Sequence, residues 1–136
     1  MSAAIRSAIS AKLNATSGVT NVVSSRIYYQ QAPADAAYPM VIFNKQAGTK
    51  TRAFQTPNAF NREVWLIKCV DRNTLPDPAE TVAAAIDTAF DNGTITVSGK
   101  KLADLTHVGD VDYLEPVGDQ QYRHHGKTFA VVTTAS

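Results

Sequence analysis

The sequence predicts an α+β domain in which a mainly antiparallel β-sheet is packed by an N-terminal helix and one central helix. Apolar residues recur at helical spacing over residues 2–14 and 78–90, whereas residues 62–70 and 122–133 have the β-branched and aromatic composition of strands. The 136 residues suffice for one core, and 44% hydrophobic against 18% charged residues is ordinary for a globular protein. We therefore expect a single domain over residues 1–136.

The first half of the chain is expected to form a helix followed by strands. Ser2 can cap the helix, and Ile5, Ile9 and Leu13 recur along one of its faces as a narrow apolar stripe. The expected elements of this half are a helix at 2–14, an apolar connector of undefined state at 19–23, and strands at 26–30 and 40–44.

The segment from residue 46 to residue 61 is polar and rich in turn-forming residues. It predicts a long loop, or alternatively a hairpin with a mobile tip, and long loops usually carry function or are disordered. We expect this segment to be mobile in the free subunit. It leads directly into residues 62–70, the strongest strand of the sequence.

The second half of the chain begins with a helix whose ends are clearly marked. Asp77 suits the N-cap, Pro78 the first helical position and Glu80 the end of a capping box. Asn92-Gly93 provides the stop signal. Further strands are expected at 94–97, 102–114 and 122–133. The side chains expected in the core are those of Ile5, Ile9, Ile27, Val41, Phe43, Trp65, Ile67, Ile86, Phe90, Phe129 and Val131.

Two of the expected strands carry apolar side chains on both faces. Consecutive positions are apolar over residues 41–43 and 64–67, so neither face of these strands is polar. Such a sheet must be covered on both sides, and two helices are enough for only one of them. The other face therefore requires a second sheet layer, another subunit, or strong curvature of the sheet within the monomer.

Charge is unevenly distributed along the chain, although the net charge is only +1. This net charge argues against a globally basic nucleic-acid binder. Residues 45–72 carry six basic side chains against two acids, and residues 77–119 carry nine acids against two lysines. Either these are ordinary solvated faces, or copies of the protein, or its partners, meet positive surface to negative surface.

Residues that could carry chemistry lack the context that chemistry requires. Cys69, the single cysteine, excludes an intrachain disulfide and lies in an apolar strand without a flanking motif. His124 and His125 are adjacent in a strand, so they point to opposite faces and cannot bind one metal ion. Gly126-Lys127-Thr128 matches the end of the phosphate-binding loop motif, but Gln121 stands where the motif has its first glycine. The residues after Thr128 are expected to form a strand, whereas the motif is followed by a helix. We expect no catalytic, cofactor-binding or metal site.

A set of short motifs resembles one known family. The sequence contains, in order, Arg26-Ile27-Tyr28, Ala37-Tyr38-Pro39, Val41-Ile42-Phe43, a long strand at 62–71, an Asp/Pro-started helix at 78–90 and final strands between 108 and 132. This order is similar to that of the small tail-completion proteins, or tail terminators, of long-tailed bacteriophages. The resemblance covers nearly the whole chain. It departs from the family at Met40, where a second aromatic residue is usual, and at residues 119–121, where a glycine-containing turn is usual.

The resemblance implies a non-enzymatic virion protein at the head-proximal end of a phage tail. Subunits of this family form a ring, typically a hexamer, which caps the tail tube and provides the surface that joins the head. The implied partners are further copies of the chain, the tail tube protein and the connector or neck proteins of the head, with no small-molecule substrate and no membrane. Before assembly the protein would reside in the host cytoplasm. The alternatives are another neck or head-completion protein, and a small nucleic-acid-binding module.

The candidate partner-binding residues follow from the charge pattern. Within 46–61, Lys50 and Arg52 would supply charge and Phe54 an apolar anchor. Cations beside aromatic rings also hold single-stranded nucleic acid, but two cations are few, so we favour a protein partner. The acidic stretch is the candidate for a complementary face, and its candidate residues are Asp104, Asp110, Asp112 and Asp119.

Overall fold

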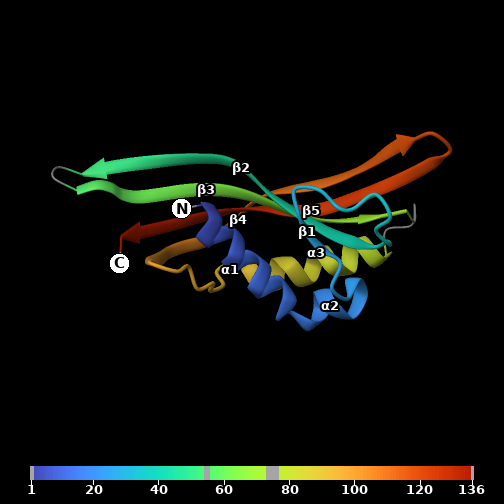
Figure 1. Ribbon diagram of the computed structural model, residues 1–136, viewed down its shortest axis with the longest axis horizontal. Coiled ribbons are helices and arrows are strands. Elements are labelled where there is room, and N and C mark those ends of the chain that lie inside the picture. The colour runs from blue at the N-terminus through green and yellow to red at the C-terminus, as the bar shows by residue number, and fades with distance from the viewer. Residues whose placement is uncertain (1, 54–55, 73–76, 136) are drawn as a thin grey trace.

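The computed structural model describes residues 2–53, 56–72 and 77–135 (Figure 1). In these ranges the helices are α1 (Ser2–Asn14), α2 (Ser17–Val23) and α3 (Asp77–Phe90). The strands are β1 (Ile27–Tyr29), β2 (Met40–Ala53), β3 (Thr56–Asp71), β4 (Lys100–Val117) and β5 (Gln120–Ala135). Among the described residues, no helix has the length and apolarity to cross a membrane.

The strands form one sheet in the order β1-β2-β3-β5-β4. β1 pairs with β2 in parallel, and the other three pairs are antiparallel. The predicted α+β fold with a mainly antiparallel sheet is confirmed. The single parallel pair arises because the chain passes from β1 to β2 through residues 30–39 instead of through a tight hairpin.

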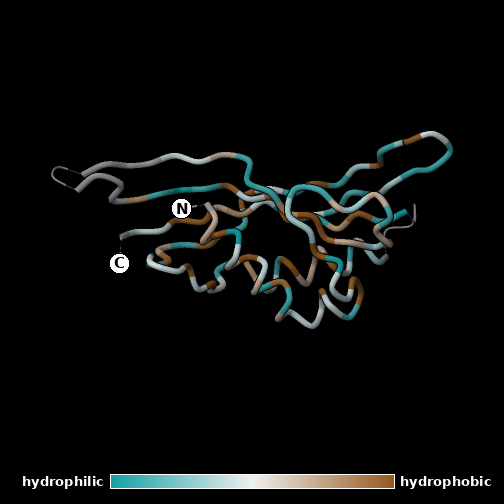
Figure 2. The backbone as a smooth tube through the Cα atoms, in the orientation of Figure 1, coloured by the Kyte–Doolittle hydropathy of each residue, from teal (hydrophilic) through white to brown (hydrophobic). Residues whose placement is uncertain are grey.

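The helices lie on one face of the sheet, and the core fills the space between them (Figure 1). Trp65 of β3 stands opposite Phe129 of β5, and Phe129 meets Phe90 of α3 with ring centroids 5.5 Å apart. The predicted core is confirmed except at Ile27, which is half-buried. Figure 2 shows the hydrophobic positions gathered in the middle of the molecule, with more hydrophilic positions along the projecting hairpins.

The apolar connector expected at 19–23 belongs to a helix. α2 buries Val19 and Val23 against the core. A Cβ atom on Gly18 would stand only 2.8 Å from the Cβ of Ala85 in α3, which is closer than van der Waals contact. The missing side chain therefore allows α2 to pack directly on α3. Tertiary packing rather than local propensity makes this short segment helical.

The strand expected at 94–97 is not formed, because these residues have an irregular backbone. Ile95 and Val97 are nevertheless buried in the core. The alternation of apolar residues thus reflects the burial of alternate side chains in the core, without strand pairing of these residues. The prediction of a strand here was wrong for this reason.

Residues 46–53 and 56–61 form the outer parts of β2 and β3, so these residues are paired strands of a hairpin and not a loop. The pairing runs outward from Gly48 opposite Glu63 to Ala53 opposite Thr56. A polar sequence suits these positions, because the side chains at 45–49 are exposed and no helix packs against them. Mobility of this segment in the free subunit stays a prediction.

The second face of the sheet has no further sheet layer within the described part of the chain. Residues 30–39 cross part of it and enclose a groove of about 370 Å³ that is lined by Met40, Ile42 and Val70. At the rim of the groove the rings of Tyr38 and Tyr122 lie 5.4 Å apart. One of the three predicted coverings, a second layer, is therefore not seen, and coverage by another subunit stays a prediction.

Candidate interaction surfaces

Two hairpins project from the sheet in opposite directions (Figure 1). We call residues 44–53 of β2 with 56–61 of β3 the basic arm, since they carry three basic side chains and no acid. We call residues 109–126 of β4 and β5 the acidic arm, since they carry four carboxylates against one arginine. The uneven charge of the sequence is thus converted into opposite charges at two ends of the molecule.

A buried carboxylate ties the base of the basic arm to the core. Glu63 is 1% exposed and accepts hydrogen bonds from Trp65 Nε1 at 2.9 Å and from Asn61 Nδ2 at 3.3 Å. Lys45 Nζ of β2 lies 3.6 Å from Glu63 Oε2. A buried charge is tolerated only when it is paired and hydrogen-bonded in this way. The cluster joins β2 to β3 at the point where the arm leaves the helices.

Cross-strand ion pairs hold the acidic arm together on its helix-facing side. Lys127 Nζ donates to Asp110 Oδ1 at 2.8 Å, and Arg123 Nη1 donates to Asp112 Oδ1 at 2.8 Å. The hydrogen bond from Lys127 is the main cause that holds the pKa of Asp110 below its usual value. The charge of Asp110 is therefore favoured and is partly neutralised within the subunit.

A second set of contacts lies on the other face of the acidic arm. The rings of Tyr113 and His124 stack with centroids 4.5 Å apart, and His124 Nε2 donates to Glu115 Oε1 at 2.9 Å. Burial lowers the pKa of His124 and outweighs the opposing effect of the Glu115 hydrogen bond. The neutral ring is thus the stable form of His124 in the folded protein at neutral pH.

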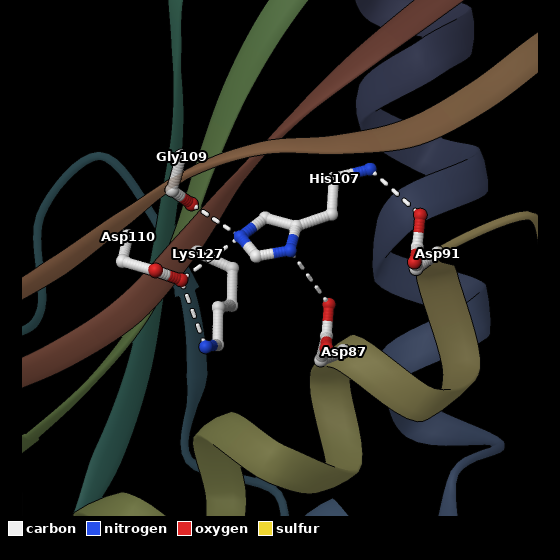
Figure 3. A network of polar contacts seen from close by, with 6 residues as sticks. All are labelled: Asp87, Asp91, His107, Gly109, Asp110 and Lys127. Carbon is white, nitrogen blue, oxygen red and sulfur yellow. Dashed lines mark hydrogen bonds and ion pairs between the residues drawn. The ribbon is translucent and has the colours of Figure 1, made fainter.

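The root of the acidic arm is attached to α3 through His107 (Figure 3). Its Nε2 atom lies 2.8 Å from the carbonyl oxygen of Gly109 and 2.9 Å from Asp110 Oδ1, and its Nδ1 atom lies 3.3 Å from Asp87 Oδ1. Its backbone N–H donates to Asp91 Oδ1 at 2.9 Å. Side chains at the C-terminal end of α3 thus fix the direction in which β4 leaves the core.

The acidic arm and its root also expose apolar side chains. Val108, Tyr113, Leu114 and Val117 of β4 are between 43% and 52% exposed, and Val108 occupies a β-bulge. Among the described residues, the remaining exposed large hydrophobic side chain is Phe60 in the basic arm. Apolar side chains grouped on an exposed edge strand usually mark a contact surface.

The sequence matches the family model of the Tail completion protein gp17 over residues 7–134. The chain belongs to this family. Tail completion proteins are structural proteins of bacteriophages, so the resemblance expected from the motifs at 26–43 is confirmed. No curated protein sequence matches the chain.

Several solved structures share the fold of this tail completion protein. A chain from a structure described as the virion of a native gene transfer agent particle has a TM-score of 0.80 at 17% identity, covering 98% of this chain and 97% of that chain. A second solved chain, without a functional description, has a TM-score of 0.60 at 17% identity, covering 100% of this chain and 96% of that chain. The low identities mean that these likenesses concern the fold.

The structure separates the candidate basic residues of this tail completion protein from most of the candidate acids. Lys50 and Arg52 lie in β2 of the basic arm, and Phe54 lies outside the described residues. Asp104 pairs with Val132 near the start of β4, away from the acidic arm. The remaining candidates, Asp110, Asp112 and Asp119, lie in the acidic arm.

Of the residues considered for catalysis, Cys69 lies opposite His125 in the β3–β5 ladder, and His125 Nδ1 lies 3.6 Å from Asp112 Oδ1. Cys69 is buried, and burial raises the pKa of its thiol to about 12, with a further contribution from Asp71. A thiol that stays protonated is a poor nucleophile. In the described ranges, no group of three or more His, Cys, Asp or Glu side chains is arranged to hold a metal ion.

Sequence reasoning missed several residues that shape the two arms of the tail completion protein. Glu63 lies within the strand expected at 62–70 and shares a strand face with Trp65, but its burial to 1% exposure was not predicted. The sequence predicts a strand at 102–114, but nothing in it distinguishes an exposed arm from a strand over the core. The signal that could have been used is the proximity of Glu63 to Trp65 on one face.

Proposed function

We propose that the protein forms a ring that closes the head-proximal end of a bacteriophage tail tube and offers the surface to which the head is joined. The observation that carries this proposal is the family match over residues 7–134. The similarity in fold to a chain of the gene transfer agent virion supports a place in an assembled particle. The role is structural rather than enzymatic.

The form of the subunit supports assembly into a ring. A head-to-tail ring uses two different patches on each subunit, and it closes when the rotation between neighbours is regular. The basic and acidic arms are two different surfaces of opposite charge, and they point away from each other (Figure 1). The proposed number of six subunits rests on the family resemblance alone.

The proposed ring has partners above and below it. The tail tube protein would contact one side of the ring, and the connector or neck proteins of the head would contact the other. Rim charges on the two arms would guide these encounters and set their salt dependence more than they would set their affinity. The protein would be present in the host cytoplasm until it is incorporated.

The proposal can be tested by deleting the gene from the phage and supplying the protein from a plasmid. We expect the deletion lysate to contain filled heads and separate tails that do not join, and the plasmid to restore complete virions. Leakage of DNA from the heads would point to a head-completion protein and contradict the proposal. A DNA affinity that falls steeply with salt, as several phosphate contacts require, would favour a nucleic-acid-binding module instead.

A further inference from the structure

Both sides of the sheet end in strands with free outer edges. Within the described ranges β4 pairs with β5 alone, so its other edge has no partner strand along the acidic arm. On the opposite side, β1 covers β2 only from Val41 to Phe43, which leaves residues 44–53 without a partner strand on that side. Free strand edges are templates for pairing with another chain.

The backbone groups that point outward from β4 can be identified from its ladder. The N–H of His107 donates to Asp91, so the backbone groups of His107 face away from β5. β5 pairs with β3 without a register shift, so every second residue of β5, counted from Phe129, directs its backbone groups toward β3. The residues of β4 that lie opposite these positions, before and after the β4 bulge, direct their backbone groups away from β5. The outward-facing residues of the acidic arm therefore include Asp110, Asp112 and Leu114.

The same reasoning applies to the free edge of β2. The carbonyl oxygen of Phe43 accepts a hydrogen bond from the N–H of Gln30, so the backbone groups of Phe43 face away from β3. After the shift in register near residue 46, Gly48 and Lys50 face outward. In β4, Pro116 is also one of the residues whose backbone faces away from β5. The missing N–H of proline at this position costs no hydrogen bond within the subunit.

We propose that the free edge of β4 in the acidic arm pairs with the free edge of β2 in the basic arm of a second copy of this chain. The sheet would then continue from subunit to subunit. β2 and β4 run in opposite directions, so the edges of two copies in the same orientation meet as an antiparallel pair. The free edges lie toward opposite ends of the sheet, so the strands cross the ring obliquely, as they do in closed sheets.

Charge and apolar exposure both favour this pairing. The basic arm presents three cations and no acid, and the acidic arm has an excess of carboxylates. Opposite charges attract unlike edges, and like charges oppose the pairing of two identical edges. The added strand would also cover the exposed side chains of Tyr113, Leu114 and Val117. This contact rests on the proposed ring and specifies how neighbouring subunits meet in it.

Proline at an outward-facing position tests the pairing, because it removes the N–H that a neighbour would use and leaves the subunit's own ladder intact. We expect Leu114→Pro and Lys50→Pro each to abolish ring formation in sedimentation and electron microscopy, with an unchanged circular dichroism spectrum. Leu114→Ala and Lys50→Ala, which keep the N–H, should form rings. An equimolar mixture of the two proline variants should form dimers, because each variant retains one intact edge.

Amide hydrogen exchange gives a test that does not depend on the folding of a variant. We expect the outward amides of Asp112, Leu114, Gly48 and Lys50 to exchange at least about tenfold more slowly in the wild-type ring than in the monomer. Unchanged exchange, or rings and active virions from both proline variants, would overturn the edge pairing and leave the proposed function standing. A wild-type protein that forms no ring, and whose deletion leaves virions complete, would overturn both.

Discussion

Replacing Glu63 with leucine should destabilise the subunit through the polar cluster at the base of the basic arm. The change removes the carboxylate that accepts hydrogen bonds from Trp65 Nε1 and Asn61 Nδ2 in a fully buried position. Each buried donor without its acceptor costs about 1–3 kcal/mol, so with some gain from burying the leucine we expect a net loss of about 2–4 kcal/mol. The ion pair with Lys45, whose side chain is 34% exposed, adds about 1 kcal/mol or less.

Urea titration followed by tryptophan fluorescence measures this loss directly, because Trp65 is the single tryptophan of the chain and a member of the cluster. Glu63→Gln is the matched control, since the amide oxygen can still accept from Trp65. We expect it to lose only about 1 kcal/mol. A Glu63→Leu variant within about 0.5 kcal/mol of the wild type would refute the reasoning, because that is the range of ordinary surface substitutions.

Three further predictions concern the core, the acidic arm and the basic arm. Phe90→Ala removes a fully buried ring that packs on Phe129, so calorimetry or urea titration should show a loss of about 3–5 kcal/mol. Burial lowers the pKa of His124 below its unfolded value, so the folded state binds fewer protons and stability should fall as the pH drops below about 6.5. His124→Gln should lack this part of the pH dependence, and an identical pH profile would contradict the assignment. Reversing Lys50 and Arg52 to glutamate should slow association, measured by light scattering at several salt concentrations, with the monomer's melting temperature nearly unchanged; unfolding of that variant would contradict it.

The elements over the core could be predicted from the sequence because their residues alternate or recur with a clear period. The stripe of Ile5, Ile9 and Leu13 and the signals around Asp77 gave helices whose bounds agree with the structure. The strand around Trp65 was predicted for the same reason and is confirmed. In these segments local propensity, burial and tertiary packing favour the same conformation.

The remaining elements depend on contacts that the sequence does not reveal. α2 exists because Gly18 permits a close approach to Ala85, which lies far away in the sequence. Residues 94–97 alternate like a strand but are buried without a strand partner. The outer parts of β2 and β3 are paired although their polar composition resembles a loop, because a hairpin away from the core needs no apolar face.

The sequence predicted the charge of the candidate interaction surfaces but not their position or their contacts in the fold. The sequence showed a basic segment followed by an acidic one, and the structure places the two arms at opposite ends of the sheet (Figure 1). The sequence could not show that Asp110 and Asp112 are paired with Lys127 and Arg123 within the subunit, because those contacts depend on the β4–β5 register.

Cryo-electron microscopy of tails isolated from the deletion phage, with and without added purified protein, tests the central claim most directly. The account predicts that the added protein appears as a ring at the head-proximal end of the tube, and that only tails carrying the ring join to filled heads. Density for the protein at the head portal, along the tube or at the distal tip, or joining of heads to tails that lack it, would contradict the account.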